Sequence, residues 1–192
     1  MDKYHFEQED VLSNKLGITD SDRLKEAEAA ICHARTLELA ANPVEGNFDF
    51  THLKRIHERL FGDLYDFAGK ARDINLAKGH SRFCQAIHID SSQRAIFEQL
   101  KREEYLCGLD KATFAHRLAY FSAELNGLHP FREGNGRAIR IFLMQLANNA
   151  GYELALHEAD SEALLLADVA AFNGCLKPLV EILCCIVRPP GD

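Results

Sequence analysis

The chain has 192 residues, of which 47% are hydrophobic, and its formal net charge at pH 7 is −7. This size and composition fit one globular domain with a buried core, and the negative charge argues against a protein that covers nucleic-acid phosphates with a basic face. The start, MDKYHFEQED, has no apolar signal segment, no run could span a bilayer, and the six cysteines form no CxxC pair. We therefore expect one domain over residues 1–192, cytoplasmic, with reduced thiols and without direct contact to nucleic acid or membrane.

Amphipathic helices are predicted for the first third of the sequence. Apolar residues recur at helical spacing over residues 20–41, where Asp20 or Ser21 can cap the helix and Asn42-Pro43 ends it. A second helix is expected in FTHLKRIHERLFGDLY, residues 50–65. The side chains expected to face the core from the first helix are Leu24, Ala27, Ile31, Ala34 and Leu37.

Between residues 71 and 89 the spacing changes to a loose alternation. The turn sequence KGHS separates two short candidate strands, which predicts a β-hairpin. Further helices are expected in SSQRAIFEQLKREEYL, in DKATFAHRLAYFSAELNGL with a cap near Asp110, and over residues 135–149, 161–170 and 176–187. The last of these contains Cys184 and Cys185, which are expected to pack in the core. The predicted fold class is mainly α, with this hairpin as the exception.

The stretch HPFREGNGR, residues 129–137, joins two predicted helices and collects groups that bind phosphate. A helix N-terminus presents free backbone N–H groups and the positive end of its dipole, which favour an anion. Gly134 and Gly136 let the backbone approach a phosphate and adopt conformations closed to other residues. Arg137 and Arg140, three residues apart, can lean toward one triphosphate.

Two other side chains of this stretch can supply chemistry. Glu133 is a lone carboxylate beside the phosphate site, and Mg²⁺ takes only one or two protein oxygens in such places. His129 can be neutral at pH 7 and can accept a proton from a hydroxyl that attacks an α-phosphate. Phe131 is expected to anchor the loop in the core. The combination predicts in-line transfer of a nucleotidyl group to a hydroxyl.

The alternatives are a structural loop and a binding module. Taken alone, a glycine-rich turn or a hydrogen-bonded histidine is ordinary, but the complete ordered set favours function. A nucleotide-binding regulatory module would hold a partner through Arg137 and the loop amides and modify nothing. Other nucleotide motifs are absent, because no GxxxxGK[ST] occurs and EGNGRAIR lacks the third glycine and the preceding strand of a dinucleotide loop.

The segment HPFREGNGRAIR resembles the signature HxFx(D/E)GNGRxxR of the Fic (filamentation induced by cAMP) family. The resemblance extends upstream through HLKRIHERLFGDLYDFAGKARDINLAKGHSRF and covers a catalytic core at about residues 44–152. The short chain is most similar to the bacterial Fic toxins of toxin–antitoxin pairs. The resemblance implies a Fic-type helical bundle with a hairpin flap over the active site. It also implies Mg²⁺-dependent transfer of AMP from ATP to a Ser, Thr or Tyr hydroxyl of a protein.

The resemblance assigns a role to each residue of the motif. His129 would be the base, Glu133 would hold Mg²⁺, and Arg140 would bind the γ-phosphate or an inhibitory glutamate. The flap, at about residues 73–83, would align a target segment by strand addition. Lys78 and Gly79 would border the nucleotide or simply form the hairpin tip. The residues expected to bind ATP are Lys78, Gly79, Gly134, Asn135, Gly136, Arg137 and Arg140.

The resemblance also implies that the residue at position 136 distinguishes two reactions within the family. Related Doc toxins carry lysine at that place and transfer a phosphoryl group. A glycine leaves room for the nucleotide to lie with its α-phosphate at the base. The resemblance thus favours AMP transfer for this chain.

Family members are commonly inhibited by a helix with the pattern (S/T)xxxE(G/N), and no Ser or Thr of this sequence begins such a pattern. In the nearest match, ANPVEGN, Ala41 replaces the Ser or Thr and Pro43 breaks the helix. Glu45 is therefore expected to be a turn residue. Inhibition is expected from a separate small antitoxin whose glutamate docks beside Arg140. The similarity to short Fic toxins points to type II topoisomerase subunits as targets, namely gyrase B and its topoisomerase IV counterpart.

Overall fold

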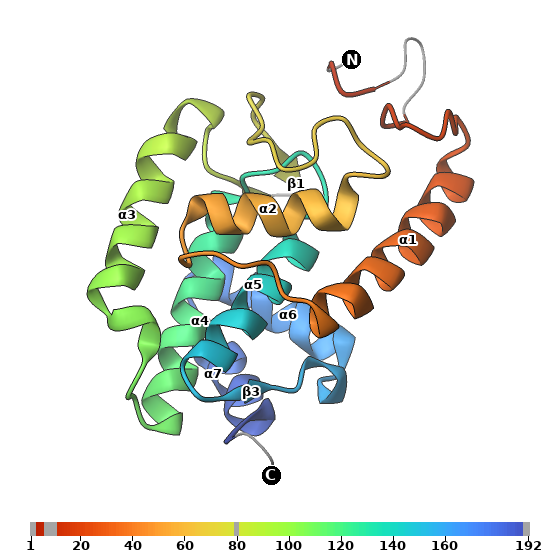
Figure 1. The fold of residues 1–192 in the computed structure, drawn as a ribbon. Helices are drawn as coiled ribbons and strands as arrows, with labels where there is room; N and C mark the ends of the chain where they lie inside the picture. The colour runs from red at the N-terminus through yellow and green to blue at the C-terminus, as the bar shows by residue number, and fades with distance from the viewer. Residues whose placement is uncertain (1–2, 6–10, 79–80, 190–192) are drawn as a thin grey trace.

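The computed structural model describes residues 3–5, 11–78 and 81–189, and these are mainly helical (Figure 1). The α-helices are α1 (Ser21–Ala41), α2 (Phe50–Phe61), α3 (Ile89–Arg102), α4 (Lys111–Leu128), α5 (Asn135–Asn149), α6 (Ser161–Phe172) and α7 (Lys177–Ile186). The short strands are β1 (Ala77–Lys78), β2 (Ser81–Arg82), β3 (Glu153–Leu154) and β4 (Val187–Arg188). The predicted mainly α class is confirmed.

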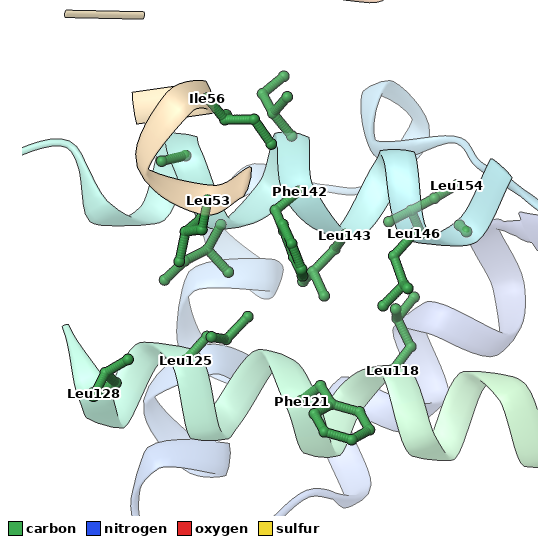
Figure 2. Close-up of a cluster of buried hydrophobic side chains, with 14 of the residues drawn as sticks. Leu53, Ile56, Leu118, Phe121, Leu125, Leu128, Phe142, Leu143, Leu146 and Leu154 are labelled. Carbon is green, nitrogen blue, oxygen red and sulfur yellow. The ribbon is translucent and has the colours of Figure 1, made fainter. Parts of the chain in front are cut away.

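Helix α4 lies at the centre of the bundle, where it contacts α3, α5, α6 and α7. Helix α5 packs against α2, and α1 covers α2 on the side of the bundle opposite to α3 (Figure 1). The facing side chains are large and apolar, and they lie buried between the helices (Figure 2). They include Leu118, Phe121 and Leu125 of α4, Phe142 and Leu146 of α5, and Leu53 and Ile56 of α2. This core fixes the adjoining ends of α4 and α5, where the motif loop lies.

Aspartate side chains begin four of the helices. Asp20, Asp49, Asp110 and Asp160 each accept a hydrogen bond from a backbone N–H in the first turn of α1, α2, α4 and α6. Each cap satisfies part of the unpaired donor set at a helix start. The predicted caps at Asp20 and Asp110 are confirmed, and the bounds of α5 are those predicted.

The predicted core face of α1 is wrong in part. Leu24 is buried, but Leu37 is 60% exposed, and Cys32 and Leu39 take the buried positions instead. Because α1 packs on α2 at the edge of the bundle, only a narrow stripe with a spacing of seven or eight residues becomes buried. Of the rest of the predicted face, Ala34 is exposed, whereas Ile31 is partly buried against the core.

Two predictions near the C-terminus also need correction. Strands β3 and β4 pair antiparallel, with Leu154 opposite Val187, so the hairpin is not the only strand pair in the described part of the chain. Cys184 is half-buried and Cys185 is exposed, so the expectation that both pack in the core is wrong. Neighbouring residues on a helix point in different directions, and only one of the two can turn inward. All six cysteines are free thiols.

Strands β1 and β2 form the predicted hairpin, with Ala77 opposite Arg82 and Lys78 opposite Ser81. In Figure 1 the hairpin lies beside α2, at the end of the bundle that carries the motif loop. Within the described residues, no helix has the length and apolar character needed to cross a membrane.

Candidate active site

The candidate site is built on the loop that joins α4 to α5. His129 ends α4 with a left-handed backbone (φ 44°, ψ 60°), and its N–H donates to the carbonyl of Leu125 at 3.0 Å. A second left-handed residue, Gly134 (φ 77°), begins α5. A non-glycine residue in this conformation costs on the order of 1 kcal/mol. Contacts around His129 must therefore hold it in place.

The ring of His129 is half-buried and has two fixed neighbours. Its Nδ1 lies 3.3 Å from the carbonyl oxygen of Asn126, and its face stacks on the ring of Phe83 with 3.7 Å between centroids. Phe83 follows β2 of the hairpin and is itself packed edge-on by Phe172 of α6. Because Nδ1 faces a carbonyl, it carries the proton of the neutral ring, and the lone pair that can accept a proton is on Nε2.

Phe131 anchors the loop, as the sequence predicted. Its side chain is fully buried, and its ring stacks on that of His57 with 3.8 Å between centroids. The side chain of Asn135 closes the loop around it, because its Oδ1 accepts from the N–H of Phe131 and its Nδ2 donates to the carbonyl of Phe131, both at 2.8 Å. The Asn135 amide is thus used within the loop. Because Asn135 is only 2% exposed, its backbone N–H is the group expected to contact an α-phosphate.

His57 is a second positioning group, to which the sequence analysis assigned no role. Its Nδ1 accepts from the N–H of Gly69 at 2.9 Å, so its Nε2 carries the proton and donates to the carbonyl of Glu133 at 2.9 Å. Burial, with a smaller contribution from the charge of Arg137, lowers the pKa of the His57 imidazole to about 4. The only sequence signal was a histidine on the same side of α2 as Leu53, Ile56 and Leu60.

The N-terminus of α5 differs from those that aspartate caps. Gly134 makes no side-chain cap, which leaves the N–H groups of the first turn of α5 available to an anion. A Cβ on Gly134 would lie 2.2 Å from Cζ of Phe61, so both space and its positive φ require glycine here. Gly136 has ordinary helical backbone, and a Cβ there would meet nothing within 4 Å. The expected special conformation is therefore wrong for Gly136, and only the open space beside it remains.

The two motif arginines are held by carboxylates of different helices. Nη2 of Arg137 lies 2.5 Å from Oε1 of Glu28 in α1 and 3.6 Å from Oε1 of Glu133. Nη2 of Arg140 lies 3.7 Å from Oδ2 of Asp168 in α6. The two guanidinium groups thus bind separate partners rather than one shared point. A triphosphate that engages both must share or replace these carboxylates.

Glu28 is itself fixed on its other side, since its Oε2 accepts a hydrogen bond from the hydroxyl of Tyr65. Both of its carboxylate oxygens are therefore engaged. The hydrogen bond to Glu28 and its charge outweigh the effect of burial and raise the pKa of Arg137. Neither Glu28 nor Asp168 stood out in the sequence, because each lies on a helix remote from the motif.

The carboxylate of Glu133 fits an ion that phosphates also bind. Its side chain is 45% exposed, and its Oε1 accepts from the N–H of Gly134 at 2.9 Å. Among the described residues, no group of three His, Cys, Asp or Glu side chains could hold a metal by itself. A cation here would need phosphate oxygens and water as further ligands, which is the way Mg²⁺ binds. Of the two flap residues expected near the nucleotide, Lys78 lies in β1, and Gly79 lies outside the described residues.

Comparisons with known proteins found related sequences. The sequence model of the Fic/DOC family matches residues 47–147. The protein adenylyltransferase VbhT of Bartonella schoenbuchensis is 41% identical over 173 residues, which are 90% of this chain and 36% of that protein. The chain therefore spans about a third of that relative's length. The probable protein adenylyltransferase Fic of Escherichia coli is 37% identical over 193 residues, which cover 100% of this chain and 94% of that protein.

Solved structures share the fold over nearly the whole chain. The BepC protein of Bartonella tribocorum with bound AMPPNP superposes with a TM-score of 0.90 at 27% identity, covering 97% of this chain and 96% of that one. The N-terminal Fic domain of a putative cell filamentation protein of Bartonella quintana, with bound ADP, gives a TM-score of 0.92 at 26% identity. It covers 98% of this chain and 95% of that one.

The buried, neutral His57 should make stability depend on pH. The pKa of His57 is about 4 in the folded protein, against the ordinary histidine value of 6.5 in the unfolded chain. The unfolded chain therefore binds more protons than the folded protein between pH 4 and pH 6.5. The wild type should therefore lose stability on the order of 3 kcal/mol from this group as the pH falls from about 6.5 to about 4. His57→Gln should remove that part of the slope in urea unfolding measured across this range. The control is His116→Gln, an exposed residue of α4, and equal slopes for wild type and His57→Gln would contradict the assignment.

Proposed function

The chain belongs to the Fic/DOC family, and on that premise we propose that it transfers AMP from ATP to a Ser, Thr or Tyr hydroxyl of a target protein. Relatives from Escherichia coli and Salmonella typhimurium, of which the alignments cover 94% and 90%, are named probable protein adenylyltransferases. The predicted family and enzyme class are thereby confirmed. The observation that carries the proposed reaction is the pairing of an uncapped α5 N-terminus with the proton-accepting ring of His129 at the two ends of one loop.

Each group of the loop has a place in this reaction. The first-turn N–H groups of α5 and the guanidinium groups of Arg137 and Arg140 bind the phosphates of ATP. Nε2 of His129 takes the proton of the target hydroxyl, whose oxygen then attacks the α-phosphorus. The bond from the α-phosphorus to the oxygen bridging it to the β-phosphorus breaks, and pyrophosphate leaves. Mg²⁺, bound by Glu133 and the phosphates, would neutralise charge on the oxygens of the leaving group.

Gly136 supports this orientation of the nucleotide. A side chain at this position would extend into the open space beside the first turn of α5. Without one, the α-phosphate can approach the turn and lie within reach of His129. The bound AMPPNP of BepC and the bound ADP of the Bartonella quintana domain support an adenine nucleotide as the ligand of this site.

Replacement of His129 tests the proposed chemistry. With ATP labelled at the α-phosphorus, wild-type protein should label proteins of a bacterial lysate, and His129→Ala should label them about 10²- to 10⁴-fold more slowly. EDTA should abolish labelling by the wild type. His116→Ala, at an exposed position of the same helix, serves as the control and should label normally. Equal labelling by wild type and His129→Ala would remove the base assignment. If neither the wild type nor His129→Ala labels proteins and both bind ATP with the same affinity, a binding module is favoured.

We propose type II topoisomerase subunits, gyrase B and its topoisomerase IV counterpart, as the targets, and we place the reaction in the cytoplasm. The similarity to short bacterial Fic toxins supports the target, and the six free thiols are in keeping with the compartment. Strand addition to the flap would require an extended target segment that carries a hydroxyl. Mass spectrometry of cells that express the wild type should find AMP on these subunits. AMP confined to unrelated proteins would contradict this target and leave the chemistry intact.

We further propose that a separate small antitoxin restrains the enzyme with a glutamate beside Arg140. Glu45 lies exposed in the irregular segment between α1 and α2, so it has no helix that could carry it to the site. Asp168 is the carboxylate that does lie near Arg140, at 3.7 Å, and it belongs to the packed helix α6.

The chain alone should therefore be active. Purified wild type, Glu45→Gly and Asp168→Asn should all label lysate proteins, and neither substitution should increase the rate. The rates follow from the time course of label incorporation at fixed ATP. A silent wild type that Glu45→Gly or Asp168→Asn makes strongly active would show that inhibition is internal.

A further inference from the structure

Arg72 lies at the base of the flap with a buried guanidinium group. The residue is 3% exposed. Its Nε donates to the carbonyl of His129 at 2.8 Å, and its Nη1 donates to the carbonyl of Ile74 at 2.5 Å. Its Nη2 donates to the carbonyl of Cys84 at 2.6 Å and reaches that of Leu128 at 3.4 Å. One side chain therefore joins three separate segments of the chain.

These segments are the two arms of the flap and the end of α4. Ile74 precedes β1, Cys84 follows β2, and His129 carries the proposed base. Main-chain hydrogen bonds reinforce the junction, because the N–H of Arg72 donates to the carbonyl of Pro130 at 2.8 Å and that of Cys84 to the carbonyl of Gly127 at 2.9 Å. The flap is thus fastened at its base to the residues on both sides of His129.

The contacts of Arg72 are unusual for a buried cation. The partners found for its side chain in the described structure are carbonyl oxygens, and no carboxylate is among them. A buried charge without an opposite charge is costly, and burial lowers the pKa of Arg72. The side chain does satisfy carbonyls that α4 leaves unpaired at its C-terminal end, where a cation is favoured. The planar guanidinium group, which donates hydrogen bonds in several directions, accounts for an arginine here better than charge pairing does.

The same junction fixes the ring of His129. Phe83 immediately precedes Cys84, whose carbonyl Arg72 holds, and its ring stacks on the His129 imidazole with an interplanar angle of 11°. Arg72 thus sets the backbone of the left-handed residue 129, and the flap arm that Arg72 holds presents the ring that covers the imidazole. A shift of that arm would move Phe83 and the imidazole together.

We propose that Arg72 is a positioning residue that couples the flap to the general base, so that the target segment and Nε2 of His129 are held in one register. The inference rests on the proposed function of His129 and the flap. Lysine at this position would keep the charge but could not donate along three directions from a planar fork. The nucleotide site at the start of α5 makes no direct contact with the Arg72 side chain in the described structure. A substitution of Arg72 should therefore slow AMP transfer and leave the affinity for the nucleotide unchanged.

The test compares Arg72→Lys with Arg117→Lys in the full chain. Arg117 is half-buried and donates two hydrogen bonds to the carboxylate of Glu103, remote from the flap. It therefore controls for the general cost of replacing a hydrogen-bonded arginine by lysine. Three quantities are measured below the melting temperature of each variant. They are the affinity for AMPPNP by calorimetry, the rate of lysate labelling from α-labelled ATP, and backbone hydrogen exchange.

We expect Arg72→Lys to bind AMPPNP within about twofold of the wild type and to label about 10- to 100-fold more slowly, as a small misplacement of the base would cause. Exchange should become faster at the amides of residues 72, 84 and 129 and should stay unchanged in α5. Arg117→Lys should label normally. Unchanged labelling by Arg72→Lys, or an equal loss of AMPPNP affinity and labelling, would overturn the proposal.

Two further outcomes separate this inference from the proposed function. If the wild type itself labels nothing, the proposed function fails, and hydrogen exchange alone then decides the role of Arg72. Unchanged exchange at residues 84 and 129 in Arg72→Lys would overturn the coupling in that case. If Arg72→Lys does not fold, Arg72→Gln is measured in its place, and failure of both to fold would assign Arg72 to the core and also overturn the proposal.

Discussion

A left-handed backbone at each end of the loop between α4 and α5 is the constraint on which the site depends. His129 ends α4 in this conformation, and Gly134 begins α5 in it. The loop between these two residues joins the C-terminal end of α4 to the N-terminal end of α5. The first end supplies a histidine, and the second supplies backbone N–H groups and a positive dipole. In the proposed reaction, the loop would therefore set the distance between the proton acceptor and the phosphate site.

The loop keeps this shape because core packing and hydrogen bonds from neighbouring side chains hold it. Phe131 fills the core beneath it, and the amide of Asn135 pairs with both main-chain groups of Phe131. His57 holds the carbonyl of Glu133 from α2, and Arg72 holds that of His129 from the flap. All of these hydrogen bonds end on backbone atoms. The surrounding fold thus fixes the path of the chain through hydrogen bonds to its backbone.

The motif and its local surroundings could be predicted from sequence because they rest on near-neighbour spacing. Asp110 lies two and three residues before the N–H groups it caps, and the bounds of α5 follow from the apolar spacing of one segment. Other features depend on contacts between distant positions, such as Glu28 with Arg137, which lie 109 residues apart. The burial of α1 was misjudged for the same reason, since it depends on how many helices cover that face. Strands β3 and β4 are two residues long and carry no alternation that a sequence pattern could reveal.

In the proposed reaction the α-phosphate, and not the γ-phosphate, lies at His129. The most direct test uses two preparations of ATP, one labelled at the α-phosphorus and the other at the γ-phosphorus, with the same lysate and the same enzyme. We expect that protein retains the α label and that the γ label leaves in pyrophosphate. A γ label on protein, with the α label left in ADP, would show that the nucleotide binds in the reverse orientation and would contradict the account.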